Sequence, residues 1–98
     1  MPTEKQLRDF ITEKLTRENW ICWWSPRVKF GKQQDIFSIW DGVIAKDDKI
    51  IFIQFTTKSN KSSHIKKIKD FKQMYGLTHK GELWCYNKKT REFEIDYL

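Results

Sequence analysis

Four side chains whose groups could act together stand close along this 98-residue chain: Asp41, Gln54, Thr56 and Lys58. The last three are spaced two residues apart, which is the spacing that puts side chains on one face of a β-strand. The set offers a carboxylate, an amide, a hydroxyl and an ammonium. Carboxylate and amide oxygens are ligands for a hard cation such as Mg²⁺, and an ammonium attracts a phosphate. A fold that brings Asp41 beside that strand would therefore make a cation site next to a phosphate.

A β-hairpin is the element that must position these side chains. The runs Ile36–Ala45 and Ile50–Thr57 are rich in residues that favour strands, and the polar Lys46–Lys49 between them is typical of a hairpin connection. If that connection is symmetric, Asp41 stands directly opposite Gln54, with the two Cβ atoms ~5 Å apart on one face of the sheet. The plain structural alternative is that Asp41 caps a turn and Gln54 satisfies backbone groups at a sheet edge.

Composition and length predict a small basic domain with one modest core within residues 1–98. Lys and Arg number 19 against 13 Asp and Glu, and the net charge of +6 favours a polyanionic partner, most commonly nucleic acid. The simpler interpretation is that a basic surface only keeps the protein in solution. No apolar run approaches the ~20 residues of a membrane span, and Cys22 and Cys85 lack the spacing of metal ligands. We therefore expect a soluble protein of the reducing cytoplasm, that of the host cell if the protein is viral, without a membrane partner.

The rest of the chain predicts two helices and three further strands around the hairpin. The first helix begins with a capping box, in which Thr3 is the N-cap and Gln6 its partner, and the second helix ends at Gly76. The strand Trp20–Trp24 is apolar on both faces, as in a central strand, and the last strand alternates with Tyr97 facing inward. In order, the expected elements are a helix from Thr3 to about Glu18, strands at Trp20–Trp24, Ile36–Ala45 and Ile50–Thr57, a helix at His64–Tyr75, and strands at Glu82–Tyr86 and Arg91–Leu98. The order α-β-β-β-α-β-β predicts an α/β fold with a mixed central sheet flanked by helices.

Basic residues gather in two segments that could contact a phosphate backbone. One is the loop after the Trp-rich strand and the other is the Lys-rich start of the second helix, although such charges are more often only solvated. These residues are Arg27, Lys29 and Lys32 in the loop, and Lys61, His64, Lys66 and Lys67 at the helix. Glu4 falls at the edge of the apolar face of the first helix, where it serves either a site or, as an ordinary first-turn acid, the helix dipole.

The order of elements and the residues of the hairpin resemble the PD-(D/E)xK nuclease superfamily, which includes restriction enzymes and Holliday-junction resolvases. In that superfamily an Asp on the second strand precedes a (D/E)-x-K tripeptide on the third, and a Glu of the first helix often joins them. Asp41 in IWDGVIA matches the Asp, Gln54-Phe55-Thr56 falls where the tripeptide should be, and Glu4 resembles the helix Glu. The stretch from Asp35 to Phe71 also resembles small phage and archaeal relatives in which Gln-x-Thr replaces Glu-x-Lys.

This resemblance implies a restriction-endonuclease-like fold and a Mg²⁺- or Mn²⁺-dependent endonuclease or resolvase that cleaves DNA phosphodiesters. The catalytic residues that it implies are Asp41, Gln54, Lys58 and Glu4, and the cation ligands are Asp41, Glu4, Gln54 and Asp35. Gln54 departs from the pattern, because a neutral amide is a poorer ligand for Mg²⁺ than a carboxylate. Thr56 cannot replace the Lys, but Lys58 lies in phase on the same face and could substitute for it. Many relatives act as dimers, which leaves a homodimer open.

Two other classes of function stay open. One is a domain of the same fold that binds nucleic acid without cutting it, and Gln-x-Thr in place of (D/E)-x-K is its best support. The other is a small regulator that acts through an aromatic surface, which would require Trp23, Trp24 and Trp40 to be exposed together.

Overall fold

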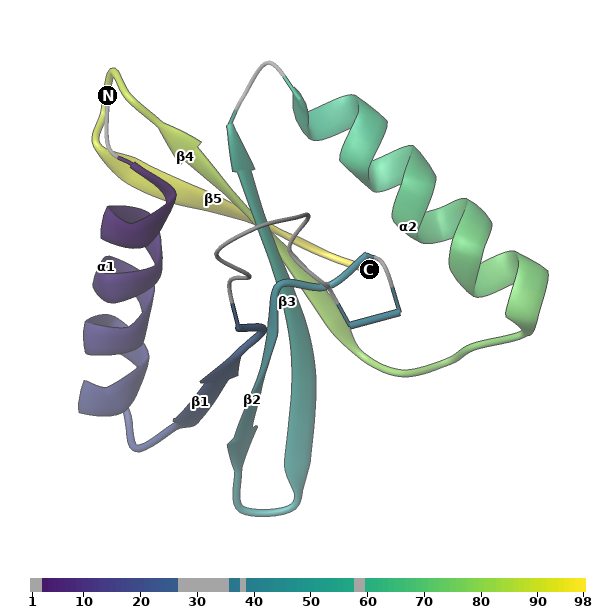
Figure 1. The fold of residues 1–98 in the computed structure, drawn as a ribbon, viewed down its shortest axis with the longest axis horizontal. Coiled ribbons are helices and arrows are strands. Elements are labelled where there is room, and N and C mark those ends of the chain that lie inside the picture. Colours follow the sequence, from purple (N-terminus) through teal and green to yellow (C-terminus); the bar gives the residue numbers. More distant parts are fainter. Residues whose placement is uncertain (1–2, 27–35, 38, 58–59) are drawn as a thin grey trace.

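The computed structural model describes residues 3–26, 36–37, 39–57 and 60–98. Its elements are α1 (Glu4–Arg17), β1 (Ile21–Trp24), β2 (Gly42–Lys46), β3 (Lys49–Thr57), α2 (Lys61–Tyr75), β4 (Gly81–Asn87) and β5 (Glu92–Tyr97). The strands form one sheet in the order β1-β2-β3-β4-β5, in which β3 and β4 are parallel and the other neighbours are antiparallel (Figure 1). The predicted mixed sheet with two helices in an α/β fold is thus confirmed.

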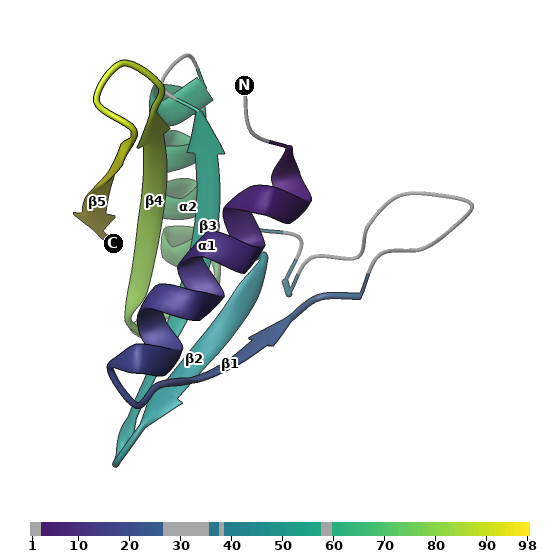
Figure 2. The same cartoon turned by 90° about the vertical axis from the view of Figure 1, so that its left-hand side faces the viewer.

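The two helices cover opposite faces of the sheet. In Figure 2, α1 lies in front of the sheet and α2 lies behind it. Each face carries its own buried cluster, and strand alternation decides which residues join which cluster. The α1 face holds Leu7, Ile11, Leu15, Ile44, Ile53, Phe55 and Trp84, and the α2 face holds Ile39, Trp40, Ile68 and Leu83. Because Gln54 and Thr56 alternate with Ile53 and Phe55, their side chains belong to the α2 face.

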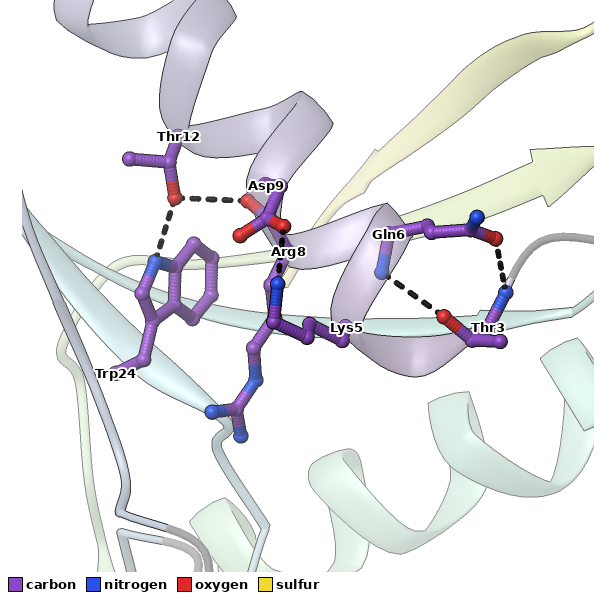
Figure 3. A network of polar contacts seen from close by, with 7 residues as sticks. All are labelled: Thr3, Lys5, Gln6, Arg8, Asp9, Thr12 and Trp24. Atoms are coloured by element: carbon purple, nitrogen blue, oxygen red, sulfur yellow. Dashed lines mark hydrogen bonds and ion pairs between the residues drawn. The ribbon is translucent and has the colours of Figure 1, made fainter.

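Polar contacts fix the start of α1 and its contact with β1. The predicted capping box is present: Thr3 Oγ1 accepts from the Gln6 N–H at 3.2 Å, and Gln6 Oε1 accepts from the Thr3 N–H at 2.8 Å (Figure 3). The Trp24 indole N–H of β1 donates to Thr12 Oγ1 at 2.8 Å. The Arg8 guanidinium donates to the Ser25 carbonyl at 3.1 Å. The last two bonds hold the middle of α1 over the end of β1.

The predicted strand Ile36–Ala45 is wrong in its first half. β2 begins at Gly42, and Ile36 meets Trp40 in an isolated bridge, with the Trp40 N–H donating to the Ile36 carbonyl at 2.9 Å. The segment packs Ile39 and Trp40 against α2, so its apolar residues reflect a buried turn and not a strand. Trp40 is fully buried, so Trp23, Trp24 and Trp40 are not exposed together and the aromatic-surface regulator loses its premise.

Both edges of the sheet differ from the prediction. β1 is an edge strand and not a central one, with Ile21 74% and Trp23 52% exposed, because α1 covers one of its faces and α2 does not reach the other. Tyr97 on the opposite edge strand is 76% exposed and does not face inward.

Helix α2 starts three residues earlier than predicted, after the N-cap Asn60, and ends at Gly76 in the left-handed conformation as predicted. No helix in the described part of the chain has the length and apolarity to cross a bilayer.

A partly buried histidine packs beside the fully buried Trp40. The Trp40 indole N–H donates to His79 Nε2 at 3.0 Å, and Phe52 packs edge-on against the same imidazole with ring centroids 4.8 Å apart. Lys72 Nζ donates to the His79 carbonyl at 2.6 Å. The bond from Trp40 requires a bare Nε2, so His79 is neutral with its proton on Nδ1.

We expect His79 to make stability depend on pH. Burial lowers its pKa, and the nearby Lys72 ammonium lowers it further. An unfolded imidazole titrates at about 6.5, so below that pH the unfolded chain binds a proton that the folded protein resists, and the free energy of unfolding falls as the pH falls. Urea denaturation at about pH 8 and about pH 5.5 measures this loss. His79→Gln keeps an acceptor for Trp40 but does not titrate, so it should show a smaller loss. An equal loss in both proteins would contradict this account.

Candidate active site at the end of the central hairpin

The predicted register of the central hairpin is confirmed. Val43 pairs with Phe52 and Gly42 with Ile53, as a symmetric connection requires. The regular pairing ends there: Asp41, one residue before β2, donates its N–H to the carbonyl of Ile53 at 2.8 Å, although Gly42 is the register partner of Ile53. Gln54 follows Ile53 on the neighbouring strand, so the acid and the amide come to the same end of the hairpin.

The Asp41 carboxylate has a structural task of its own. Its Oδ2 accepts from the backbone N–H of Phe55 at 2.9 Å, and the side chain is only 5% exposed. A main-chain carbonyl would normally accept that N–H in a sheet, so the carboxylate extends the pairing of β3 beyond the start of β2. The structural alternative was that Asp41 caps a turn; the observed bond instead satisfies a backbone N–H of β3. A buried carboxylate is tolerated when it is hydrogen-bonded, and this bond also fixes its orientation.

Asp41, Gln54 and Thr56 line one cleft of about 320 Å³ at the carboxyl end of β3. The same end of the sheet receives the starts of both helices (Figure 1), and the cleft wall is completed by Leu7, Phe55, Thr57 and Asn60. Gln54 and Thr56 are each 7% exposed. Three of the four side chains that the sequence predicts to converge are thus together, and the fourth, Lys58, lies outside the described residues.

The two ends of the Gln54 amide have different surroundings. Its Nε2 lies 3.3 Å from His64 Nδ1 on α2. Its Oε1 is shielded from water and has no hydrogen-bond partner among the residues that the structure describes. A buried acceptor left without a donor costs about 1–3 kcal/mol, so a group or ion that engages this oxygen would be stabilised there.

The residues on either side of Asp41 have almost no freedom. A Cβ at Gly42 would lie 2.5 Å from the Trp23 carbonyl oxygen and 2.5 Å from the Trp24 ring. The Trp40 ring is fully buried, and a Cβ at Gly81 would lie 2.1 Å from it. Close packing therefore places the Asp41 backbone between β1 and β3, and its carbonyl accepts from the Ser25 N–H at 2.8 Å.

The remaining predicted site residues either lie outside the described part of the chain or are absent from the lining of the cleft. Asp35, Lys58 and the basic loop residues Arg27, Lys29 and Lys32 lie outside the described residues, as does the side chain of Glu4. Lys61 pairs with Glu94 at 3.5 Å and Asp96 at 3.1 Å, and the hydrogen bond to Asp96 raises its pKa. Lys66 pairs with Asp70 and Lys67 is exposed, so both remain open to solvent on the outer face of α2.

Sequence reasoning missed Arg8, Ser25 and Asn60. Asn60 lines the cleft as the N-cap of α2. Arg8 connects α1 to the site. Its guanidinium donates to the Ser25 carbonyl, and the Ser25 N–H in turn donates to the backbone carbonyl of Asp41. The Arg8 guanidinium also lies 5.9 Å from the centroid of the Phe55 ring. Arg8 directly follows the buried Leu7, so helix periodicity could have placed it at the edge of the buried face.

The described residues offer few ligands for a metal ion. No cluster of three or more His, Cys, Asp or Glu side chains that could hold one occurs among them. The cleft itself supplies the Asp41 carboxylate, the Gln54 amide oxygen and the Thr56 hydroxyl. Mg²⁺ is commonly bound by one or two carboxylates and keeps several waters, so this set fits a partly hydrated hard cation and does not fit a closed zinc site.

Comparison with known proteins adds no relative: no protein-family model, no curated protein and no solved structure matches this chain. The chemistry of the cleft therefore carries the functional proposal.

Two substitutions test whether the hydrogen bond from the Phe55 N–H to Asp41 stabilises the fold. Asp41→Ala removes the acceptor for the Phe55 N–H and should lower the free energy of unfolding by about 1–3 kcal/mol. Asp41→Asn keeps an oxygen acceptor on a side chain of the same length, so its free energy of unfolding should fall clearly less. Urea denaturation of both variants checks this, and equal destabilisation would show that the hydrogen bond does not hold this end of the hairpin.

Proposed function

We propose that this protein is a small endonuclease that uses Mg²⁺ or Mn²⁺ to hydrolyse phosphodiester bonds in DNA. The observation that carries the proposal is the convergence of the Asp41 carboxylate and the Gln54 amide in one cleft at the end of the central hairpin. The order of the elements around that hairpin supports a place in the PD-(D/E)xK superfamily with a restriction-endonuclease-like fold.

Each described residue of the cleft has a role in this proposal. A bound divalent ion would stabilise charge on the phosphate and lower the pKa of the attacking water. Asp41, whose carboxylate accepts from the Phe55 N–H, would be the principal ligand of that ion, and Gln54 would add a neutral oxygen. The Thr56 hydroxyl, which donates to the Thr57 carbonyl at 3.4 Å, would exchange that bond for one to a phosphate oxygen or to a water of the ion. Glu4, Asp35 and Lys58 complete the ligands and the positive charge that the resemblance implies.

Positive charge on α2 supports DNA as the partner. The helix starts at the cleft with its N-cap Asn60 and carries the exposed residues Lys66, Lys67 and Lys69 along its length. Phosphate neutralisation by such lysines gives binding that weakens with salt. A homodimer would present two clefts to two strands, and we propose the cytoplasm as the place of action.

A second candidate function is binding of nucleic acid without cleavage. Its support is the neutral amide of Gln54 where the resemblance expects an acid, next to Asp41 as the single carboxylate among the described cleft residues. In that case the lysines of α2 supply the affinity, and binding persists without a metal ion.

Metal titration and a cleavage assay decide between the two. Wild type should bind Mn²⁺ in a calorimetric titration and cut duplex, branched or single-stranded DNA in its presence. Asp41→Asn removes the negatively charged ligand. Loss of even an outer-shell partner weakens metal sites about 10- to 100-fold, so the affinity of this variant for Mn²⁺ should fall at least about 10-fold. DNA cleavage should be lost.

Asp47→Asn is the matched control. Asp47 is an exposed turn residue with φ of 55°, a conformation that Asn accepts, so this variant should behave as wild type. Full cleavage by Asp41→Asn would remove Asp41 from the mechanism. DNA binding that survives both EDTA and Asp41→Asn, with no cleavage by wild type, would establish the second candidate.

A further inference from the structure

An amide that serves as a cation ligand needs a fixed orientation. A carboxylate presents an oxygen whichever way it is turned, but an amide presents an oxygen on one side and an NH₂ group on the other. Rotation by half a turn would replace the ligand in the cleft by two N–H donors, which repel a cation. Wherever Gln stands in place of an acid, a second residue must therefore select the productive orientation.

We propose that His64 is this positioning residue: it holds the Gln54 amide with the carbonyl oxygen toward the cation site, and this role in binding rests on the proposed function. The contact is between Gln54 Nε2 and His64 Nδ1 at 3.3 Å. The opposite end of the amide, Oε1, is the buried oxygen without a hydrogen-bond partner among the described residues. Gln54 lines the cleft and His64 does not, so His64 acts from outside through Gln54.

The hydrogen-bond chemistry of the pair admits one productive arrangement. A bare Nδ1 accepts an N–H from Gln54, which leaves Oε1 available to a cation. A proton on Nδ1 would instead donate to Oε1 and turn the NH₂ group toward the cleft. The inference therefore requires the neutral His64 tautomer that carries its proton on Nε2.

Both partners sit on elements that are well held. Gln54 lies within β3, where it pairs with Leu83 of β4. His64 lies in the first turn of α2, next to Lys61, which bridges to Glu94 and Asp96 of β5. Ile68, one turn further along α2, is 1% exposed in the core. A rigid supporting partner is what keeps a first ligand in place, and such partners matter for metal affinity.

Nitrogen NMR of the metal-free wild-type protein tests the orientation directly. At about pH 8 a normal imidazole is neutral, and its two nitrogens then report which one carries the proton. His64 should show a bare Nδ1 together with a nuclear Overhauser contact from the Gln54 NH₂ group. His79 is the internal control, because its Nε2 accepts from Trp40 and it should show the opposite tautomer. A proton on Nδ1 of His64 would overturn the inference.

Calorimetric Mn²⁺ titration of variants tests the consequence for binding. His64→Phe keeps a flat ring without an acceptor and should weaken Mn²⁺ binding about 10-fold, the scale of loss for outer-shell partners. His79→Gln, at a histidine that does not line the cleft, should remain close to wild type. Wild-type affinity in His64→Phe would overturn the inference. If wild type itself binds no Mn²⁺, the proposed function fails, and the NMR result alone decides whether His64 orients Gln54.

Discussion

A hydrogen bond between two neighbouring strands holds the candidate site together. Asp41 Oδ2 accepts the Phe55 N–H at 2.9 Å at the point where regular pairing between β2 and β3 ends. Without an acceptor at that position, the last residues of β3 would lose their partner on this side. The same bond stabilises the carboxylate of a residue that is only 5% exposed, where an unpaired side chain would turn toward solvent. Strand geometry and site geometry therefore share this interaction.

Packing around this bond is rigid because large aromatic residues meet small ones. Trp40 lies against Gly81, and Gly42 lies under the Trp23 backbone and the Trp24 ring. Neither glycine can be replaced without moving a ring or a strand, so the backbone on both sides of Asp41 has one position. Arg8 and Ser25 extend the same constraint to α1. A site that must hold an ion within coordination distance gains from supports of this kind.

Local patterns allowed the register of the hairpin, the Thr3 capping box and the Gly76 helix end to be predicted from the sequence. They depend on turn length, capping chemistry and left-handed glycine, all of which act over a few residues. The errors arose where burial depends on distant elements. Ile36, Ile39 and Trp40 are apolar because they pack in the cluster under α2, and β1 is apolar although one of its faces is open.

Within the candidate site too, some residues could be placed from local sequence patterns and others could not. Asp41, Gln54 and Thr56 could be placed together because strand alternation and register are local. The contacts of Gln54 with His64 and of Arg8 with Ser25 join residues that are distant in the sequence or lie on different elements. Nothing in the spacing of those residues indicates that they meet, so only a three-dimensional structure could reveal them.

Diffraction from crystals soaked in Mn²⁺ tests the central claim most directly. The account predicts an anomalous peak in the cleft, within coordination distance of one Asp41 carboxylate oxygen and of Gln54 Oε1, with the Asp41–Phe55 hydrogen bond intact. A cleft without a peak at saturating Mn²⁺, or a Gln54 amide whose NH₂ group faces the bound ion's position, would contradict it.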